Sequence, residues 1–437
     1  MKKILIITYV FPPVGGAGVQ RTLKWTKYLP EFGWKPYVLT ASNPSVPVFD
    51  DSLAAEIPKD LPITRTRTFE LPYRMRRSVW NQAERAACEN RGSSLKARVL
   101  GLLKGTAQRV FMPDPQIGWW PTAYLKAVRL IRAEGIDAIV ISAPPFSTLL
   151  LGRKIAQKTR VPWIADFRDE WADFYTQAFD FHRRPGMKER IAAMEKSVVE
   201  SASAVIAVTE AVLRSYRGKY PRLSESNSFW VPNGFDAEEF EGEDPPSLEP
   251  DRFTITYSGT VFEVTTARFF LAALKNVLER QPDLRTRLRV RFLGRIVPPE
   301  RPPFEDRTFE GVLECLDYVP HTEAVRFIQS SNANLLLLSP VPTAERILPG
   351  KIFEYLAAQK PILALVPKGE SSRLIEKTSS GVSVSPTDTP AIERAIEELI
   401  ARGVNARPAP RHPDIEKFSR RETTRQLAQI LDQRVSS

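Results

Sequence analysis

The sequence predicts an α/β protein with two domains, each built around a parallel β-sheet. Short β-branched runs, bounded by Pro, Gly or Asp, alternate with longer helical patterns, which is typical of βα units. The alternation starts again in the second half of the chain, after an acidic and Pro-rich segment. The chain has 437 residues and an ordinary globular composition, and this length suits two to three domains.

The predicted strands fall into two groups. In the first half they are 3–10, 36–40, 137–142, 161–165, 204–208 and 229–231. In the second half they are 253–258, 289–293, 333–338, 362–366 and 381–384. Segment 236–252 between the groups is predicted as a linker because it is acidic and Pro-rich. We therefore expect a first domain at 1–235, a second at 253–410, and a C-terminal helix within 411–437 that packs back on the first domain.

Composition limits the function classes. The 62 Lys and Arg outnumber the 51 Asp and Glu, and the net charge of +11 suits phosphorylated ligands, nucleic acid or an anionic membrane. The two cysteines, Cys88 and Cys315, are too far apart for a disulfide framework or a zinc cluster, which makes a reducing compartment the default. The apolar start has no cleavage site, and no apolar run reaches the ~18 residues of a spanning helix. We expect a soluble or peripheral protein.

A glycine-rich loop follows the first predicted strand. It contains Gly15, Gly16 and Gly18, with Arg21 in the helical pattern that follows. Glycines let a ligand approach the backbone, and Arg21 near a helix N-terminus favours a bound anion. A plain glycine-rich turn is the alternative. The loop lacks the third glycine of a dinucleotide-binding fingerprint, and the sequence has no Gly-Lys-Ser/Thr phosphate loop, so a dehydrogenase and a P-loop ATPase are disfavoured.

A second candidate loop follows the predicted strand 333–338. A helix that starts near Gly350 places Lys351 and Glu354 on one face, beside its first-turn N–H groups. A lysine there suits a bound anion, and the carboxylate can accept two hydrogen bonds from a ribose diol. The combination indicates a nucleoside diphosphate. A surface ion pair is the alternative.

Four motifs occur in an order that resembles family-four glycosyltransferases, which have the GT-B fold of two Rossmann-like domains. They are Tyr9-Val-Phe-Pro-Pro-Val-Gly-Gly-Ala-Gly, Val231-Pro-Asn-Gly-Phe-Asp, Tyr257-Ser-Gly-Thr and Pro349-Gly-Lys-Ile-Phe-Glu-Tyr. The resemblance implies transfer of a sugar from a nucleotide-diphosphate donor, with retention at the anomeric carbon and with neither metal nor cofactor. It also implies sheets that face each other across a cleft, with the donor mainly on the second domain and the acceptor on the first.

The resemblance assigns roles by position. Gly15 and Gly16 approach the donor's phosphate and sugar, Lys351 contacts the diphosphate, and Glu354 contacts the ribose. Negative charge grows on the leaving nucleoside diphosphate as the glycosidic bond breaks. Fixed cations and helix N–H groups therefore stabilise the transition state more than the ground state.

The sequence departs from the family pattern in its acids. The family has two glutamates seven residues apart, but Arg346 stands where the first is expected and Glu345 is one position away. Either the loop is one residue longer and Glu345 is the acid, or Arg346 contacts phosphate or sugar itself. Leu149 stands where relatives often have a histidine.

It also departs in its cations. The family often carries Arg and Lys after the glycine that corresponds to Gly259. This chain has Thr260 and Thr266 there, and Arg268 or Arg295 are the candidate substitutes for donor binding.

An acidic motif follows the predicted strand 161–165. Asp166 and Asp169 flank Arg168, and Glu170 comes next. These acids are candidates for hydrogen bonds to acceptor hydroxyls or for orienting the sugar. The alternative is an ion-pair cluster around Arg168 that caps a helix. The three histidines are more typical of surface residues than of catalysts, namely His182, His321 and His412.

A basic segment, 73–112, contains nine Lys and Arg and two Glu, a local charge of +7. Its apolar residues recur on one helical face, which suits an amphipathic helix on an anionic membrane. The alternative is a solvated helical insertion that packs on its own domain. Nucleic acid is disfavoured because aromatic residues do not interleave with the basic ones.

Together these features predict a cytoplasmic, membrane-peripheral glycosyltransferase of surface polysaccharide or glycolipid assembly. Its partners are a nucleotide sugar and a glycan or lipid-linked acceptor. Two alternatives remain: a nucleotide-sugar epimerase or hydrolase of the same fold, and a non-catalytic scaffold that binds nucleotide sugar or membrane.

Overall fold

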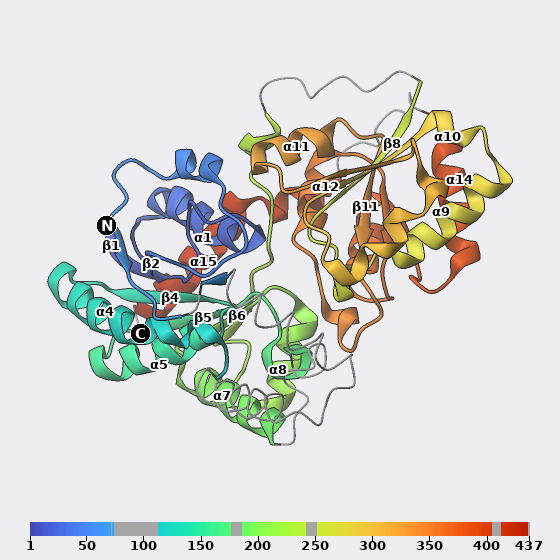
Figure 1. Cartoon of the computed structure of the whole chain (residues 1–437). Coiled ribbons are helices and arrows are strands. Elements are labelled where there is room, and N and C mark those ends of the chain that lie inside the picture. Colours follow the sequence, from blue (N-terminus) through green and yellow to red (C-terminus); the bar gives the residue numbers. More distant parts are fainter. Residues whose placement is uncertain (71, 74–111, 176–185, 242–250, 404–411, 436–437) are drawn as a thin grey trace, which may run out of the picture.

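The computed structural model describes residues 1–70, 72–73, 112–175, 186–241, 251–403 and 412–435. It contains a seven-stranded and a six-stranded sheet whose pairings are all parallel, which confirms the predicted α/β class (Figure 1). The basic segment 73–112 lies almost entirely outside the described residues, as does His182.

The first sheet has the strand order β3-β2-β1-β4-β5-β6-β7. Its strands are β1 (Lys2–Ile7), β2 (Trp34–Ala41), β3 (Ile63–Thr66), β4 (Ala138–Ala143), β5 (Trp163–Phe167), β6 (Ala204–Ala207) and β7 (Ser228–Trp230). Its helices are α1 (Ala17–Tyr28), α4 (Trp120–Glu134), α5 (Ser147–Thr159), α7 (Met187–Ser201), α8 (Glu210–Lys219) and α15 (Arg420–Val435). Helices α1 and α15 cover one face, and the others cover the opposite face (Figure 1).

The second sheet has the order β10-β9-β8-β11-β12-β13. Its strands are β8 (Phe253–Ser258), β9 (Leu288–Leu293), β10 (Leu313–Leu316), β11 (Ala333–Leu337), β12 (Ile362–Leu365) and β13 (Gly381–Val384). Its helices are α9 (Arg268–Arg280), α10 (Leu284–Arg287), α11 (His321–Gln329), α12 (Lys351–Ala358), α13 (Glu370–Thr378) and α14 (Thr389–Ala401). One core lies under α9 and α14, and the other lies under α12 and α13.

Two edge strands differ from the sequence prediction. The strands β3 and β10 lie at sheet edges, and the sequence patterns predict neither. Most of their side chains are only partly buried, and both strands have four residues. They lack the apolar runs that marked the central strands, because an edge strand buries less surface.

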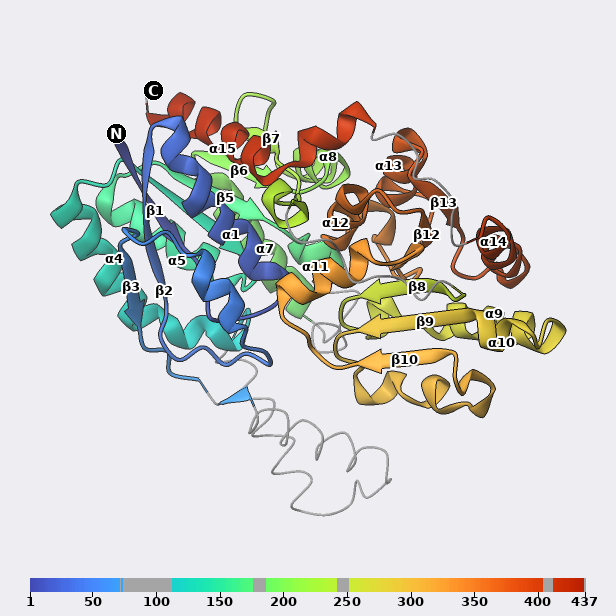
Figure 2. The same ribbon diagram turned by 90° about the horizontal axis from the view of Figure 1, so that it is seen from above.

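The carboxyl ends of the strands in the second sheet point toward the first domain. Figure 2 shows β8, β9 and β10 running in this direction. In parallel sheets, ligands bind beyond the carboxyl ends of the strands. The loops that follow the strands of both sheets therefore meet between the domains.

The chain crosses between the domains twice, and the two crossing segments are bonded to each other. The N–H of Phe235 donates to the carbonyl of Phe418 at 3.1 Å, and the N–H of Arg420 donates to the carbonyl of Phe235 at 2.7 Å. Phe235 and Phe418 pack in the core under α12, whereas Leu427 and Leu431 of α15 pack in the core under α1. The last helix thus belongs to the first domain although the chain enters it from the second (Figure 2).

A substitution at Gly234 tests whether the two crossing segments are tightly packed. A Cβ at Gly234 would overlap the carbonyl oxygen of Phe418 and crowd the carbonyl carbon of the same residue. We expect Gly234→Ala to lower the free energy of unfolding by about 1–3 kcal/mol, as overpacking against backbone does. Urea denaturation of the full chain measures this change.

Gly218→Ala in α8 is the matched control, because a Cβ there meets open space. It should leave the free energy of unfolding unchanged or raise it by up to about 1 kcal/mol, since alanine favours helix over glycine. Equal effects of the two substitutions would contradict a tightly packed crossing.

Candidate functional site

A cavity of about 300 Å³ lies between the domains. The first domain contributes residues from the start of α1 and from the loop after β5. The second contributes residues from the loop after β11 and from the start of α12, and the start of α15 closes the cavity. Its lining includes Gly18, Arg168, Asp169, Glu170, Asn233, Arg346, Gly350, Glu354 and Arg420.

The glycine loop lies where the domains approach each other. A Cβ at Gly15 would lie 2.6 Å from the Tyr318 hydroxyl of the second domain and 2.8 Å from a Val48 methyl group. Gly16 precedes α1 with a φ of 100°, a conformation that favours glycine. Gly18 lines the cavity, and its carbonyl accepts a hydrogen bond from Nη1 of Arg168 at 2.5 Å. Close packing, and not turn formation alone, therefore requires small residues in this loop.

Arg21 and Asp166 form a buried ion pair inside the first domain. Nε and Nη2 of Arg21 donate to the two carboxylate oxygens of Asp166 at 2.9 and 2.7 Å. The same guanidinium donates to the carbonyls of Val231 and Pro232, and Ser142 donates to Asp166. The sequence predicts donor binding for Arg21 and catalysis for Asp166. Both groups are instead engaged by protein partners, and neither lines the cavity.

The rest of the acidic motif faces the cavity. Asp169 is exposed at its wall, and Glu170 is buried there. Nη1 of Arg346 lies 2.5 Å from Oε1 of Glu170 and donates to Ser215 at 2.8 Å. Burial raises the pKa of Glu170 to about 7 even though Arg346 opposes the shift. Oε2 of Glu170 has no hydrogen-bond partner among the described residues.

Two adjacent residues of the second domain pair with each other, with Nε of Arg346 3.4 Å from Oε1 of Glu345, but only one of them lines the cavity. Arg346 lines the cavity and ties the second domain to Glu170 of the first. Glu345 is not among the lining residues, and its side chain is 53% exposed. Of the two candidates for the position of the family's first acid, the structure thus places Arg346 at the cavity.

Helix α12 begins at the cavity, as its sequence predicts. Gly350 precedes it, and Nζ of Lys351 lies 2.6 Å from Oε2 of Glu354. Glu354 is 9% exposed and lines the cavity. The ion pair between them is therefore present, and it holds the Glu354 carboxylate in place at the cavity wall.

The remaining predicted donor-binding residues lie outside the cavity lining. Gly259 has a φ of 154° in the turn after β8, and the carbonyl of Thr260 accepts a hydrogen bond from the Tyr257 hydroxyl. Arg268 pairs with Glu300 at 3.2 Å. Nη1 of Arg295 donates to the Tyr73 hydroxyl at 2.7 Å. Of the predicted residues, the cavity brings together Asp169, Arg346 and Glu354.

Sequence reasoning missed Arg420, which is the first residue of α15 and lines the cavity. Its position depends on the return of the last helix to the first domain, and no motif surrounds it in the sequence. Glu170 is part of the acidic motif, but its pairing with Arg346 depends on how the domains meet. Asn233, in the motif Val231-Pro-Asn-Gly-Phe-Asp, also lines the cavity.

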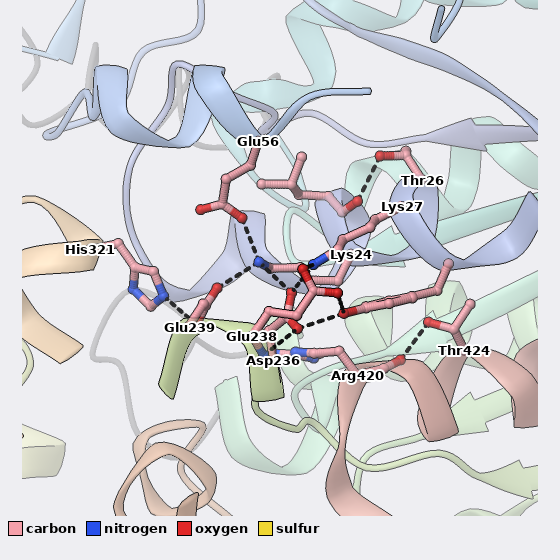
Figure 3. A network of polar contacts seen from close by, with 12 residues as sticks. Lys24, Thr26, Lys27, Glu56, Asp236, Glu238, Glu239, His321, Arg420 and Thr424 are labelled. Carbon is pink, nitrogen blue, oxygen red and sulfur yellow. Dashed lines mark hydrogen bonds and ion pairs between the residues drawn. The ribbon is translucent and has the colours of Figure 1, made fainter. Parts of the chain in front are cut away.

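A network of buried charges joins the domains beside the cavity (Figure 3). Nζ of Lys24 pairs with Asp236 at 2.7 Å and with Glu239 at 2.6 Å, and it also contacts Glu56. Nε2 of His321 lies 2.9 Å from Glu239. The backbone N–H of His321 donates to Asp50 of the first domain at 3.0 Å.

This network bears on two sequence expectations and corrects one of them. Asp236 and Glu239 belong to the segment predicted as a linker. Asp236 is buried, the Glu239 side chain is 13% exposed, and both pair with Lys24. His321 was expected at the surface, and this prediction is wrong, since the residue is only 8% exposed. Burial lowers the pKa of His321, but Glu239 more than offsets this, and the pKa is raised overall.

The pair of His321 and Glu239 predicts a pH dependence of stability. Because the folded-state pKa of His321 is raised, its contribution is complete below the unfolded pKa of about 6.5 and is lost as pH rises through the folded pKa. We therefore expect His321→Gln to lower the urea midpoint more at pH 6 than at pH 9. Denaturation series at both pH values check this.

His412→Gln is the matched control, since the His412 ring accepts a hydrogen bond from the N–H of Asp414 and lies away from Glu239. It should show no comparable pH-dependent loss. A loss for His321→Gln that is the same at both pH values would contradict a charged pair.

The described residues contain neither a grouped metal site nor a membrane-spanning helix. Within the described ranges, no three His, Cys, Asp or Glu residues are grouped as a metal site. No helix among the described residues combines the length and apolar character needed to cross a bilayer.

Part of the chain matches a known family. Residues 85–239 match the family Glycosyltransferase Family 4. No curated protein matched the sequence. Solved structures matched over nearly the whole chain, and each has the GT-B fold. HepE of Anabaena in complex with UDP is 15% identical, with a TM-score of 0.63 and coverage of 99% of this chain and 100% of that one.

Two other structures extend the comparison. The lipopolysaccharide outer core galactosyltransferase WaaB is 11% identical, with a TM-score of 0.58 and coverage of 98% and 99% of the two chains. A mutant of S. aureus TarM in complex with fondaparinux, α-GlcNAc-glycerol and UDP is 10% identical, with a TM-score of 0.63 and coverage of 99% and 100%. At these identities the likeness shows the fold.

Proposed function

We propose that this GT-B glycosyltransferase moves a sugar from a nucleotide-diphosphate donor to a glycan or lipid-linked acceptor, with retention and without a metal ion. The observation that carries the proposal is the interdomain cavity. The start of α12, with Gly350 and Glu354, lies there opposite Gly18 of the glycine loop. The complexes of HepE and TarM with UDP support a nucleotide donor.

The donor's nucleotide is proposed to bind at α12. The positive end of a helix dipole favours a diphosphate, and Lys351 adds a cation at the same turn. The Glu354 carboxylate, held by Lys351 at 2.6 Å, accepts hydrogen bonds from the ribose hydroxyls. The cavity, at about 300 Å³, is at the lower end of the range for small-molecule sites.

The reaction is proposed to proceed by charge stabilisation. The bond between the anomeric carbon and the diphosphate oxygen breaks, and the acceptor oxygen bonds to the same face of the sugar. The acceptor's proton passes to the departing diphosphate. The cations and helix dipoles around the cavity stabilise the charge that develops on the diphosphate. Asp169, at the wall formed by the first domain, is placed to hydrogen-bond an acceptor hydroxyl.

Assembly of surface polysaccharide or glycolipid is the proposed setting. WaaB, named for the lipopolysaccharide outer core, and TarM, bound to α-GlcNAc-glycerol, support acceptors of this kind. The basic segment 73–112 remains a proposed contact with anionic lipid, and a cytoplasmic location fits this role.

Thermal shift with UDP, GDP, ADP and their sugar conjugates will identify the nucleotide, because specific binding raises apparent stability. With the best ligand, we expect Lys351→Ala to weaken binding about tenfold or more in calorimetry, through loss of a charge-assisted contact. Lys377→Ala is the control, since Lys377 lies on α13 with a side chain that is 66% exposed. Unchanged binding by the Lys351 variant would count against this site.

Product analysis separates transfer from its alternatives. With the identified donor, we expect a glycosylated product only when acceptor is present, and NMR should show the donor's anomeric configuration retained. Free sugar or an epimerised donor in the absence of acceptor would favour the hydrolase or epimerase. Binding without any turnover would favour the scaffold.

A further inference from the structure

Arg420 is a buried arginine that faces the interdomain cavity. It is 7% exposed, and its Nη1 has no hydrogen-bond partner among the described residues. Both backbone polar groups of Arg420 are hydrogen-bonded. Its N–H donates to the carbonyl of Phe235, and its carbonyl accepts from the Thr424 hydroxyl. Figure 3 shows the side chain extending from the start of α15 beside the network of buried charges. Burying a guanidinium without a partner raises the free energy of the folded state, so this side chain favours the binding of an anion.

The carboxylates near Arg420 are already neutralised by other cations. Glu354 is held by Lys351, and Glu239 is held by Lys24 and His321. Asp236 pairs with Lys24 and Lys27 and accepts a hydrogen bond from Tyr28. Arg420 itself forms no ion pair within the described residues. Burial, helped by the nearby Arg21, lowers the pKa of Arg420 to about 10, although Glu239, Glu354 and Asp236 oppose the shift.

Three helix N-termini lie at the cavity. The starts of α1, α12 and α15 place Gly18, Gly350 and Arg420 in its lining. The dipole of each helix places partial positive charge at its N-terminus. A cation at such an end is unfavourable in an empty site and becomes favourable when an anion binds between the helices.

The other arginines of the cavity are engaged. Arg168 donates to the carbonyls of Ala143, Pro144 and Gly18, and Arg346 pairs with Glu170. The chain has threonines where the resemblance expects two phosphate-binding cations. The proposed substitutes, Arg268 and Arg295, do not line the cavity. Arg420 is therefore the lining arginine with a guanidinium nitrogen, Nη1, that no described residue satisfies.

We propose that Arg420 binds the diphosphate of the donor, contributed by the C-terminal helix after it has returned to the first domain. The inference rests on the proposed function, because the anion is the donor's diphosphate. A guanidinium donates two parallel hydrogen bonds to phosphate oxygens. Because α15 packs on the first domain and α12 on the second, one diphosphate links both domains.

Calorimetry with inorganic pyrophosphate, UDP, GDP and ADP tests the proposal. We expect Arg420→Gln to weaken binding of the diphosphate nucleotide that wild type binds, and of pyrophosphate, by about 10- to 100-fold. Arg420→Lys keeps the charge but loses the paired hydrogen bonds. Its affinity should lie between those of wild type and Arg420→Gln. Arg421→Gln is the matched control, since the adjacent Arg421 is 64% exposed and pairs with Glu31 at 2.6 Å. It should bind as wild type does.

Unfolding without ligand gives a second readout. Because Arg420→Gln removes a buried, unpaired cation, its urea midpoint should equal or exceed that of wild type. A marked loss of stability would show that the fold uses the side chain and would overturn the proposal. Wild-type affinity in both Arg420 variants would overturn it as well, while leaving the proposed function in place. Failure of wild type to bind any of the four probes would overturn the proposed function and this inference together.

Discussion

The structure depends on the double crossing of the chain between its domains. Phe235 leaves the first domain, Phe418 returns to it, and their backbones are hydrogen-bonded where they pass. The two phenyl rings pack under α12, so the crossing is part of the second domain's core. This constraint sets the position of α15 and brings its first residue to the cavity. The loops of two sheets that are far apart in sequence thus share one site.

Charge at this junction is balanced unevenly. Lys24 and His321 pair with acids where the domains meet, and Arg21 and Asp166 neutralise each other inside the first domain. In the cavity lining, Nη1 of Arg420 is left without a hydrogen-bond partner among the described residues, at the start of α15. A protein that binds and releases a diphosphate has a reason to keep such an imbalance, because full neutralisation would leave the ligand nothing to pair with.

The sequence allowed prediction of the central strands, the glycine loop and the start of α12, since these depend on local patterns. It did not reveal β3 and β10, whose burial is partial, nor the partners of Arg21 and Asp166, which lie 145 residues apart in the chain. His321 was placed wrongly because its acid partner comes from a segment that looks like a linker. Arg420 has no motif around it. The surroundings of His321 and Arg420 depend on how the domains meet, and the pair of Arg21 and Asp166 depends on the folding of the first domain; local sequence encodes neither.

A crystal structure of the chain with the nucleoside diphosphate that stabilises it most would show where the ligand binds. We expect the diphosphate inside the interdomain cavity, between Gly18 and Gly350, with its oxygens in contact with the guanidinium of Arg420. A nucleotide bound outside this cavity, or one whose phosphates face away from α12 and α15, would contradict this expectation.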